Sequence, residues 1–133
     1  MAGTIAVNGQ VDFGVNGRYR TMRLLCTTEA DGSFSIALPN DAMVFLGGML
    51  LERFKVVTGA GGPTINSDLA MTDVDEATAD LLGAEGADIV ELSDVNVVIL
   101  TTPVPLYEAF VLTVTNNIVA SAVFEIVLIC RSV

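Results

Sequence analysis

The sequence predicts an all-β protein that folds as an antiparallel β-sandwich or a jelly-roll-like barrel of about 8–10 strands. Three observations predict this class. β-Branched and aromatic residues gather in short runs, Gly, Asn, Asp and Pro separate the runs, and apolar residues alternate with polar ones inside several of them. The 133 residues suffice for one domain whose core needs no metal or disulfide.

The N-terminal segment, residues 1–17, is predicted to form an arm or hairpin beside a single sandwich domain of residues 18–133. Residues 4–7 are a short strand candidate, and the Asn-Gly pairs at 8–9 and 16–17 have the composition of tight turns. Such a segment could reach across a neighbouring molecule.

The clearest strand pattern begins at Tyr19, where Met22, Leu24 and Cys26 alternate and so fall on one face of a sheet. A second alternating run follows an Asp-Gly turn. We therefore predict a β-hairpin over residues 21–38.

The longest apolar stretch of the first half, residues 43–58, is divided by glycines at 47–48, which disfavour a helix through its middle. Residues 49–58 are predicted to be a strand, and a helix over residues 42–54 is the alternative.

The second half contains further strand candidates and one ambiguous segment. Residues 77–82 have the pattern of a short helix or strand, and Pro103 and Pro105 are expected to break the strand before them. The last two strands are predicted to form a hairpin, and the final one is almost wholly apolar, as in a strand covered on both faces. The predicted strands are residues 67–72, 88–92, 95–101, 108–115 and 121–131.

The composition excludes several functions. Histidine is absent, so Ser-His-Asp and Cys-His catalysis are excluded in their usual forms, and we expect no enzymatic activity and no cofactor. The net charge of −10 disfavours direct nucleic-acid binding, which requires clustered Lys and Arg. No run is long and apolar enough to predict a membrane-spanning helix.

An acidic turn supplies the candidate metal ligands, Asp73, Asp75 and Glu76. Carboxylates two residues apart on a loop can bind Ca²⁺ through oxygen. The glycine and the terminal glutamate of an EF-hand are not at their proper spacing, and a solvated turn is the competing interpretation. We therefore predict no metal site.

Charge is divided unevenly along the chain. Residues 1–58 carry five acids and five bases, whereas residues 59–133 carry eleven acids and one base. Two surfaces of different polarity would let one side bind while the other repels, although acidic residues that only maintain solubility would give the same pattern.

Five bases are predicted to form an interface toward an acidic partner: Arg18, Arg20, Arg23, Arg53 and Lys55. The competing interpretation is scattered surface charge that pairs within the chain. A hydrophobic fraction of 52% indicates in addition that some apolar surface is covered by another subunit.

Cys26 and Cys130 both lie in apolar runs, and the sequence does not begin with the pattern of a signal peptide. We expect two buried, reduced thiols in a protein made in the cytoplasm.

The central part of the chain follows a recognisable order of strands and turns. A Val-Thr-rich strand end and a Gly/Pro loop at 54–64 precede a Ser-Asp-hydrophobic strand that ends in Thr-Asp-Val-Asp at 66–75, and an Asp-Leu-Leu-Gly step follows at 80–84. A Leu-Thr-Val-Thr-Asn strand at 112–116 and an apolar strand at 122–130 complete the order.

This order, with the strand–turn–strand pattern at 23–36, resembles small structural proteins of tailed bacteriophages over most of residues 20–130. The sequence departs from that pattern at 76–79, where the family usually has an Asp-Gly step, and at 88–94, where a basic, Thr-rich run is expected.

The resemblance implies a virion protein without enzymatic activity, most simply a capsid cement or decoration protein. Made in the host bacterial cytoplasm, it would bind the outer capsid surface as a homo-oligomer or symmetric array and stabilise contacts between major capsid proteins, without touching nucleic acid or membrane. A tail, neck or fibre component is one alternative, and a calcium- or carbohydrate-binding β-module is another.

Overall fold

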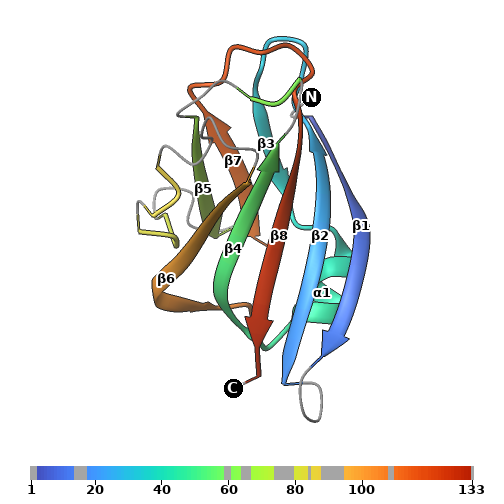
Figure 1. Cartoon of the computed structure of the whole chain (residues 1–133), viewed down its shortest axis with the longest axis vertical. Helices are drawn as coiled ribbons and strands as arrows, with labels where there is room; N and C mark the ends of the chain where they lie inside the picture. Colours follow the sequence, from blue (N-terminus) through green and yellow to red (C-terminus); the bar gives the residue numbers. More distant parts are fainter. Residues whose placement is uncertain are drawn as a thin grey trace.

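The computed structural model describes residues 3–13, 18–58, 61–63, 67–73, 80–83, 85–87, 95–107 and 110–132. Two antiparallel sheets pack face to face, with one short helix against β2 (Figure 1). The predicted all-β sandwich is therefore confirmed. In chain order the elements are β1 (Thr4–Phe13), β2 (Tyr19–Thr27), β3 (Phe34–Ala37), α1 (Asn40–Leu46), β4 (Leu50–Thr58), β5 (Asp68–Asp73), β6 (Val95–Pro105), β7 (Phe110–Thr115) and β8 (Val123–Arg131).

The larger sheet has five strands in the order β1-β2-β8-β4-β6, and the smaller sheet has three in the order β3-β7-β5. Every neighbouring pair is antiparallel. The pairings of the described strands leave both sheets open, so this part of the chain is a sandwich and not a closed barrel.

The core lies between the sheets and is built from one face of each. Met22, Leu24 and Cys26 alternate on β2, as the sequence predicts, and all three are fully buried. β7 alternates in the same way in the smaller sheet. The rings of Phe34 on β3 and Phe124 on β8 meet edge-on, with centroids 5.4 Å apart, and join the two sheets.

Two predicted hairpins are wrong. β2 lies between β1 and β8 in the larger sheet while β3 pairs with β7 in the smaller one, so residues 21–38 cross from one sheet to the other. β7 and β8, predicted as the final hairpin, are also in different sheets. Alternation shows that one face of a strand is buried, but a connection that crosses a sandwich buries the same face as a hairpin does.

The two crossing connections bind each other at one end of the sandwich. The Thr28 N–H donates to the carbonyl of Ala122 (2.9 Å), and the Ala122 N–H donates to the Thr28 hydroxyl (2.8 Å). The Ser121 N–H donates to the carbonyl of Glu29 (3.0 Å). These bonds satisfy backbone groups where the chain leaves one sheet for the other.

Residues 4–13 belong to the larger sheet. They lie within the arm or hairpin predicted over residues 1–17, form β1 and pair antiparallel with β2. Ile5 and Val7 pack against the core, which explains why the segment joins the sheet instead of standing apart from it.

The apolar stretch over residues 43–58 divides at its two glycines. α1 ends at Leu46 and β4 begins at Leu50, so the predicted strand is confirmed and the alternative helix is present only in its first part. No helix in the described part of the chain has the length and hydrophobicity needed to cross a bilayer.

β6 continues through Pro103 and Pro105, which were expected to break it. β6 is an edge strand, where a residue without an N–H can be accommodated. In the ambiguous segment, Asp80 forms an isolated bridge with Thr72 and residues 81–83 form a turn. Residues 77–79 and the strand predicted at 88–92 lie outside the described residues.

We predict that Gly32→Ala destabilises the protein more than Gly48→Ala. Both glycines have positive φ, 89° and 81°, where alanine costs about 1–2 kcal/mol. A Cβ on Gly32 would also lie 2.6 Å from the Asn117 carbonyl oxygen, whereas one on Gly48 meets nothing within 4 Å. Urea unfolding should show an excess loss of about 1–3 kcal/mol for Gly32→Ala. Equal losses would show that this turn accommodates the methyl group.

Candidate interaction surface

β8 is buried on both of its faces from Ile126 to Cys130, where its sequence is wholly apolar. One set of alternate residues lines the core. Val127 and Ile129 belong to the other set and point to the outer side of the larger sheet, yet they are only 1% and 8% exposed. Something on that outer side must therefore cover them.

Long side chains on the neighbouring strands flank these two residues. In the register of the sheet, Val127 lies between Arg23 of β2 and Lys55 of β4, and Ile129 lies opposite Arg53 of β4. The aliphatic stems of Arg and Lys cover apolar surface while their charged ends stay in water. Arg23, Arg53 and Lys55 are thus neighbours of Val127 and Ile129 whose stems are long enough to cover them.

Apolar surface continues on both sides of this strip. Val97 and Ile99 of β6 lie opposite Lys55 and Arg53 and are 49% and 68% exposed, and Leu25 of β2 is 40% exposed. We call the central part of this outer side the basic face and define it by nine residues: Arg23, Leu25, Arg53, Lys55, Val97, Ile99, Glu125, Val127 and Ile129.

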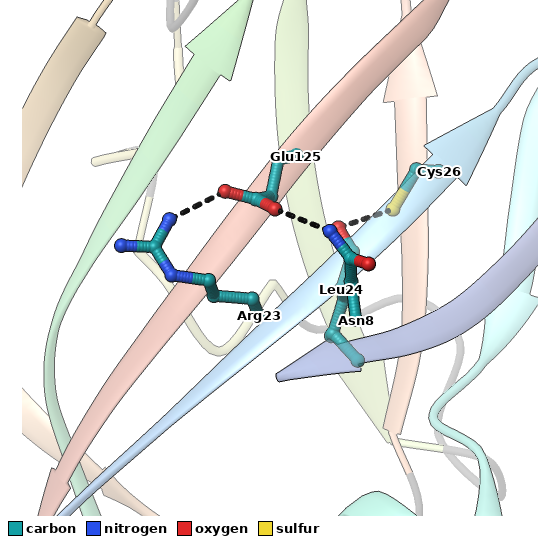
Figure 2. Close-up of polar contacts among 5 residues, drawn as sticks. All are labelled: Asn8, Arg23, Leu24, Cys26 and Glu125. Carbon is teal, nitrogen blue, oxygen red and sulfur yellow. Dashed lines mark hydrogen bonds and ion pairs between the residues drawn. The ribbon is translucent and has the colours of Figure 1, made fainter. Parts of the chain in front are cut away.

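One carboxylate, Glu125, lies within the basic face. It accepts hydrogen bonds from the Arg23 guanidinium (2.6 Å) and from Asn8 Nδ2 (3.1 Å), so it lies between the two side chains (Figure 2). Asn8 stands at a bulge where the register of β1 against β2 shifts between Val7 and Gly9. The bulge lets the Asn8 amide reach across β2 to β8.

The charge of this face is opposite to that of the rest of the chain. The face carries three bases and one acid, a net charge of +2, and the remaining 15 acids and three bases give −12. Neither Arg53 nor Lys55 forms an ion pair with a carboxylate among the described residues. Both cations therefore lie on the basic face without a carboxylate partner among the described residues.

The five bases predicted as an interface are divided by the structure. Arg23, Arg53 and Lys55 meet on the basic face, and Arg18 and Arg20 do not. The Arg20 guanidinium donates to the Phe45 carbonyl (2.6 Å) and lies 4.9 Å from the centroid of the Phe45 ring.

Through these two contacts with Phe45, the Arg20 side chain links β2 to α1. Arg18 is exposed just before β2, and its carbonyl accepts a hydrogen bond from the Ser132 N–H (2.7 Å).

The candidate calcium ligands do not form a described site. Asp73 is the last residue of β5, and Asp75 and Glu76 lie outside the described residues. The nearby Asp80 carboxylate accepts hydrogen bonds from the backbone N–H groups of Met71 (3.1 Å) and Leu82 (3.0 Å), which is a structural role. The described residues contain no group of three His, Cys, Asp or Glu side chains that could hold a metal ion.

The sequence analysis did not predict the apolar part of the basic face or the carboxylate of Glu125. The sequence nevertheless contains a signal for each of them. Residues 97–100 are apolar at consecutive positions, which a strand with one solvated face does not require. Glu125 is the single charged residue in the apolar run at 122–130.

Comparison of the chain with family models, curated proteins and solved structures found no match in any of the three. The basic face is therefore interpreted from its own geometry and charge. Exposed apolar side chains set among cations on a rigid sheet are typical of a protein-binding surface.

Both cysteines are buried and free, as the sequence predicts. Desolvation raises the pKa of the Cys26 thiol and that of the Cys130 thiol to about 12. The Cys26 thiol also donates to the Leu24 carbonyl at 3.6 Å (Figure 2). A thiol that stays protonated is a poor nucleophile.

We expect neither thiol to react with a disulfide reagent at about pH 8 in the folded protein, and both to react after denaturation. Because the folded pKa of each thiol lies above its ordinary value of 9.0, the stability that keeping the thiols protonated contributes is fully present below pH 9 and is lost as the pH rises toward 12. Cys26→Ala/Cys130→Ala should flatten this alkaline loss in denaturant titrations. Fast labelling of the native protein would contradict the prediction.

The Arg23–Glu125 pair should show measurable coupling in a double-mutant cycle with alanine. With 2.6 Å between nitrogen and oxygen and a Glu125 side chain that is 16% exposed, we expect about 0.5–1 kcal/mol at low salt and less at high salt. The matched control is Arg131–Glu52, whose atoms are 3.8 Å apart and whose carboxylate side chain, at 30% exposed, is less buried than that of Glu125. Urea unfolding measures both cycles, and equal coupling would contradict the assignment.

Proposed function

We propose that this protein is a non-enzymatic structural protein that binds other proteins through its basic face, and that it serves as a capsid cement or decoration protein of a tailed bacteriophage. The observation that carries the proposal is the contrast between a face of net charge +2 with exposed apolar side chains and a remainder of −12. Such a molecule binds an acidic surface in one orientation only, because its other sides repel it.

The face is suited to a broad protein surface. Leu25, Val97 and Ile99 offer apolar contact, and Arg53 and Lys55 lie between them. Since all of these side chains stand on paired strands, little backbone entropy is lost when they bind. Nucleic acid is a poor fit, because three cations around one carboxylate give too few phosphate contacts to offset a chain of −10.

A capsid offers the repeated protein surface that this arrangement suits. A protein that binds only the assembled shell stabilises it by mass action. The resemblance of the sequence pattern to small structural proteins of tailed phages supports the same role. Many modest contacts, repeated over a lattice, then produce durable attachment.

We expect Lys55→Glu and Arg53→Glu each to weaken binding to purified capsids at least about tenfold, and wild-type binding to weaken as salt rises. Arg18→Glu is the matched control, because it changes the net charge equally at an exposed site away from the basic face. Lys55→Gln keeps most of the stem over Val127 and separates loss of charge from loss of packing. Co-sedimentation with capsids of the phage that encodes the chain measures binding.

Equal effects of Lys55→Glu and Arg18→Glu would overturn the assignment of the face. Quantitative mass spectrometry of purified virions tests the role itself. A copy number comparable to that of the major capsid protein supports cement or decoration, a few copies per virion indicate a neck, tail or fibre part, and absence removes the virion role.

A further inference from the structure

In the described part of the chain the two open sheets present four edge strands, and hydrogen bonds cover parts of two of them, β5 and β6. Along β5, the Leu69 N–H donates to the Gly86 carbonyl (2.7 Å), and the Met71 carbonyl accepts from the Leu81 N–H (2.7 Å). A Cβ on Gly86 would lie 1.9 Å from the Leu69 carbonyl oxygen, so the approach is close. Residues 80–83 and 85–87 thus occupy the edge that another strand would use.

The β6 edge is blocked in a different way. Both carboxylate oxygens of Glu85 accept a hydrogen bond from the Thr101 N–H (3.1 Å each). Pro103 and Pro105 have no N–H to offer. The third edge, β3, is only four residues long, too short to template a long pairing.

The edge of β1 has no covering hydrogen bonds among the described residues, no proline and no short length to limit pairing. It spans ten residues, and β2 is its one strand partner in the described part of the chain. Figure 1 shows it as the outermost strand of the larger sheet. From Thr4 to Val11 it contains no charged residue and no proline, the usual means of protecting an edge.

The bulge in β1 does not close this edge. At the bulge the side chain of Asn8 turns inward over the sheet, where its amide binds Glu125 two strands away (Figure 2). In an antiparallel ladder the N–H and C=O groups of every second residue of an edge strand point away from its neighbour. β1 therefore offers a row of backbone donors and acceptors.

We propose that the free edge of β1 pairs antiparallel with β1 of a second copy, so that two five-stranded sheets join across a two-fold axis. The occupant is a second copy because the neutral run from Thr4 to Val11 can face itself without opposing like charges. When β1 pairs antiparallel with β1 of a second copy, both subunits use the same surface, as in any two-fold dimer. Such a contact is complete with two subunits and does not extend into a filament.

Salt distinguishes this contact from binding through the basic face. Two copies of charge −10 repel each other at a distance, and the neutral edge adds no attraction between charges. Screening over about 8–10 Å at moderate ionic strength reduces this repulsion. Dimerisation should therefore strengthen as salt rises, opposite to the expected binding of the basic face to an acidic partner.

The test is sedimentation equilibrium of the full chain at low and at moderate salt. We expect a species of twice the 13.9 kDa chain mass that becomes more populated with salt. Ala6→Lys/Gln10→Lys should weaken the dimer at least about tenfold, since lysines on both sides of the bulge repel their counterparts. The control is Tyr107→Lys/Thr115→Lys, which adds the same charge at exposed sites on other strands and loops.

Hydrogen exchange then locates the contact. The outward amides of β1 should exchange freely at low protein concentration and become protected as the dimer forms. A chain that stays monomeric at all salts, or a dimer whose β1 amides remain unprotected, overturns the proposal. If Ala6→Lys/Gln10→Lys still binds capsids, the proposed function stands whatever happens to the dimer. Failure of the dimer proposal can therefore be distinguished from failure of the proposed function.

Discussion

Burial of β8 on both faces is the constraint around which the larger sheet is arranged. Its inner face belongs to the core shared with the smaller sheet. No sheet or helix among the described residues forms a second layer over its outer face, and the side chains next to Val127 and Ile129 in the register belong to β2 and β4. Arg23 and Lys55 serve here because their stems are apolar and long. The charge of the basic face is thus a consequence of how the sheet buries its central strand.

The strands could be predicted because their signals are local. Alternation on β2 and β7 shows one buried face, and two adjacent glycines separate α1 from β4. Strand neighbours could not be predicted in this way. β8 pairs with β2 and β4, which lie far from it in the sequence, and nothing in residues 21–38 distinguishes a hairpin from a crossing between sheets.

For the basic face, too, spacing along one strand could be predicted from the sequence, whereas pairing between distant strands could not. Arg20 and Arg23 are three residues apart on one strand, and an odd spacing places them on opposite faces, so their separation could have been read from the sequence. That Arg53 and Lys55 lie on one face follows from the same rule. Their meeting with Arg23, by contrast, depends on the register of β8 between β2 and β4, which long-range pairing alone establishes.

The face and the edge of the larger sheet are linked by symmetry. When a strand pairs antiparallel with its own copy, the two-fold axis stands perpendicular to the sheet, so the same side of both sheets faces the same direction. A dimer through β1 would therefore place two basic faces side by side on one continuous surface. The two faces would bind one acidic protein surface together, and the second contact would form at a high effective concentration. Pairing through β3, β5 or β6 is hindered by a short strand, by covering hydrogen bonds or by prolines. The geometry thus favours the one edge that enlarges the basic face.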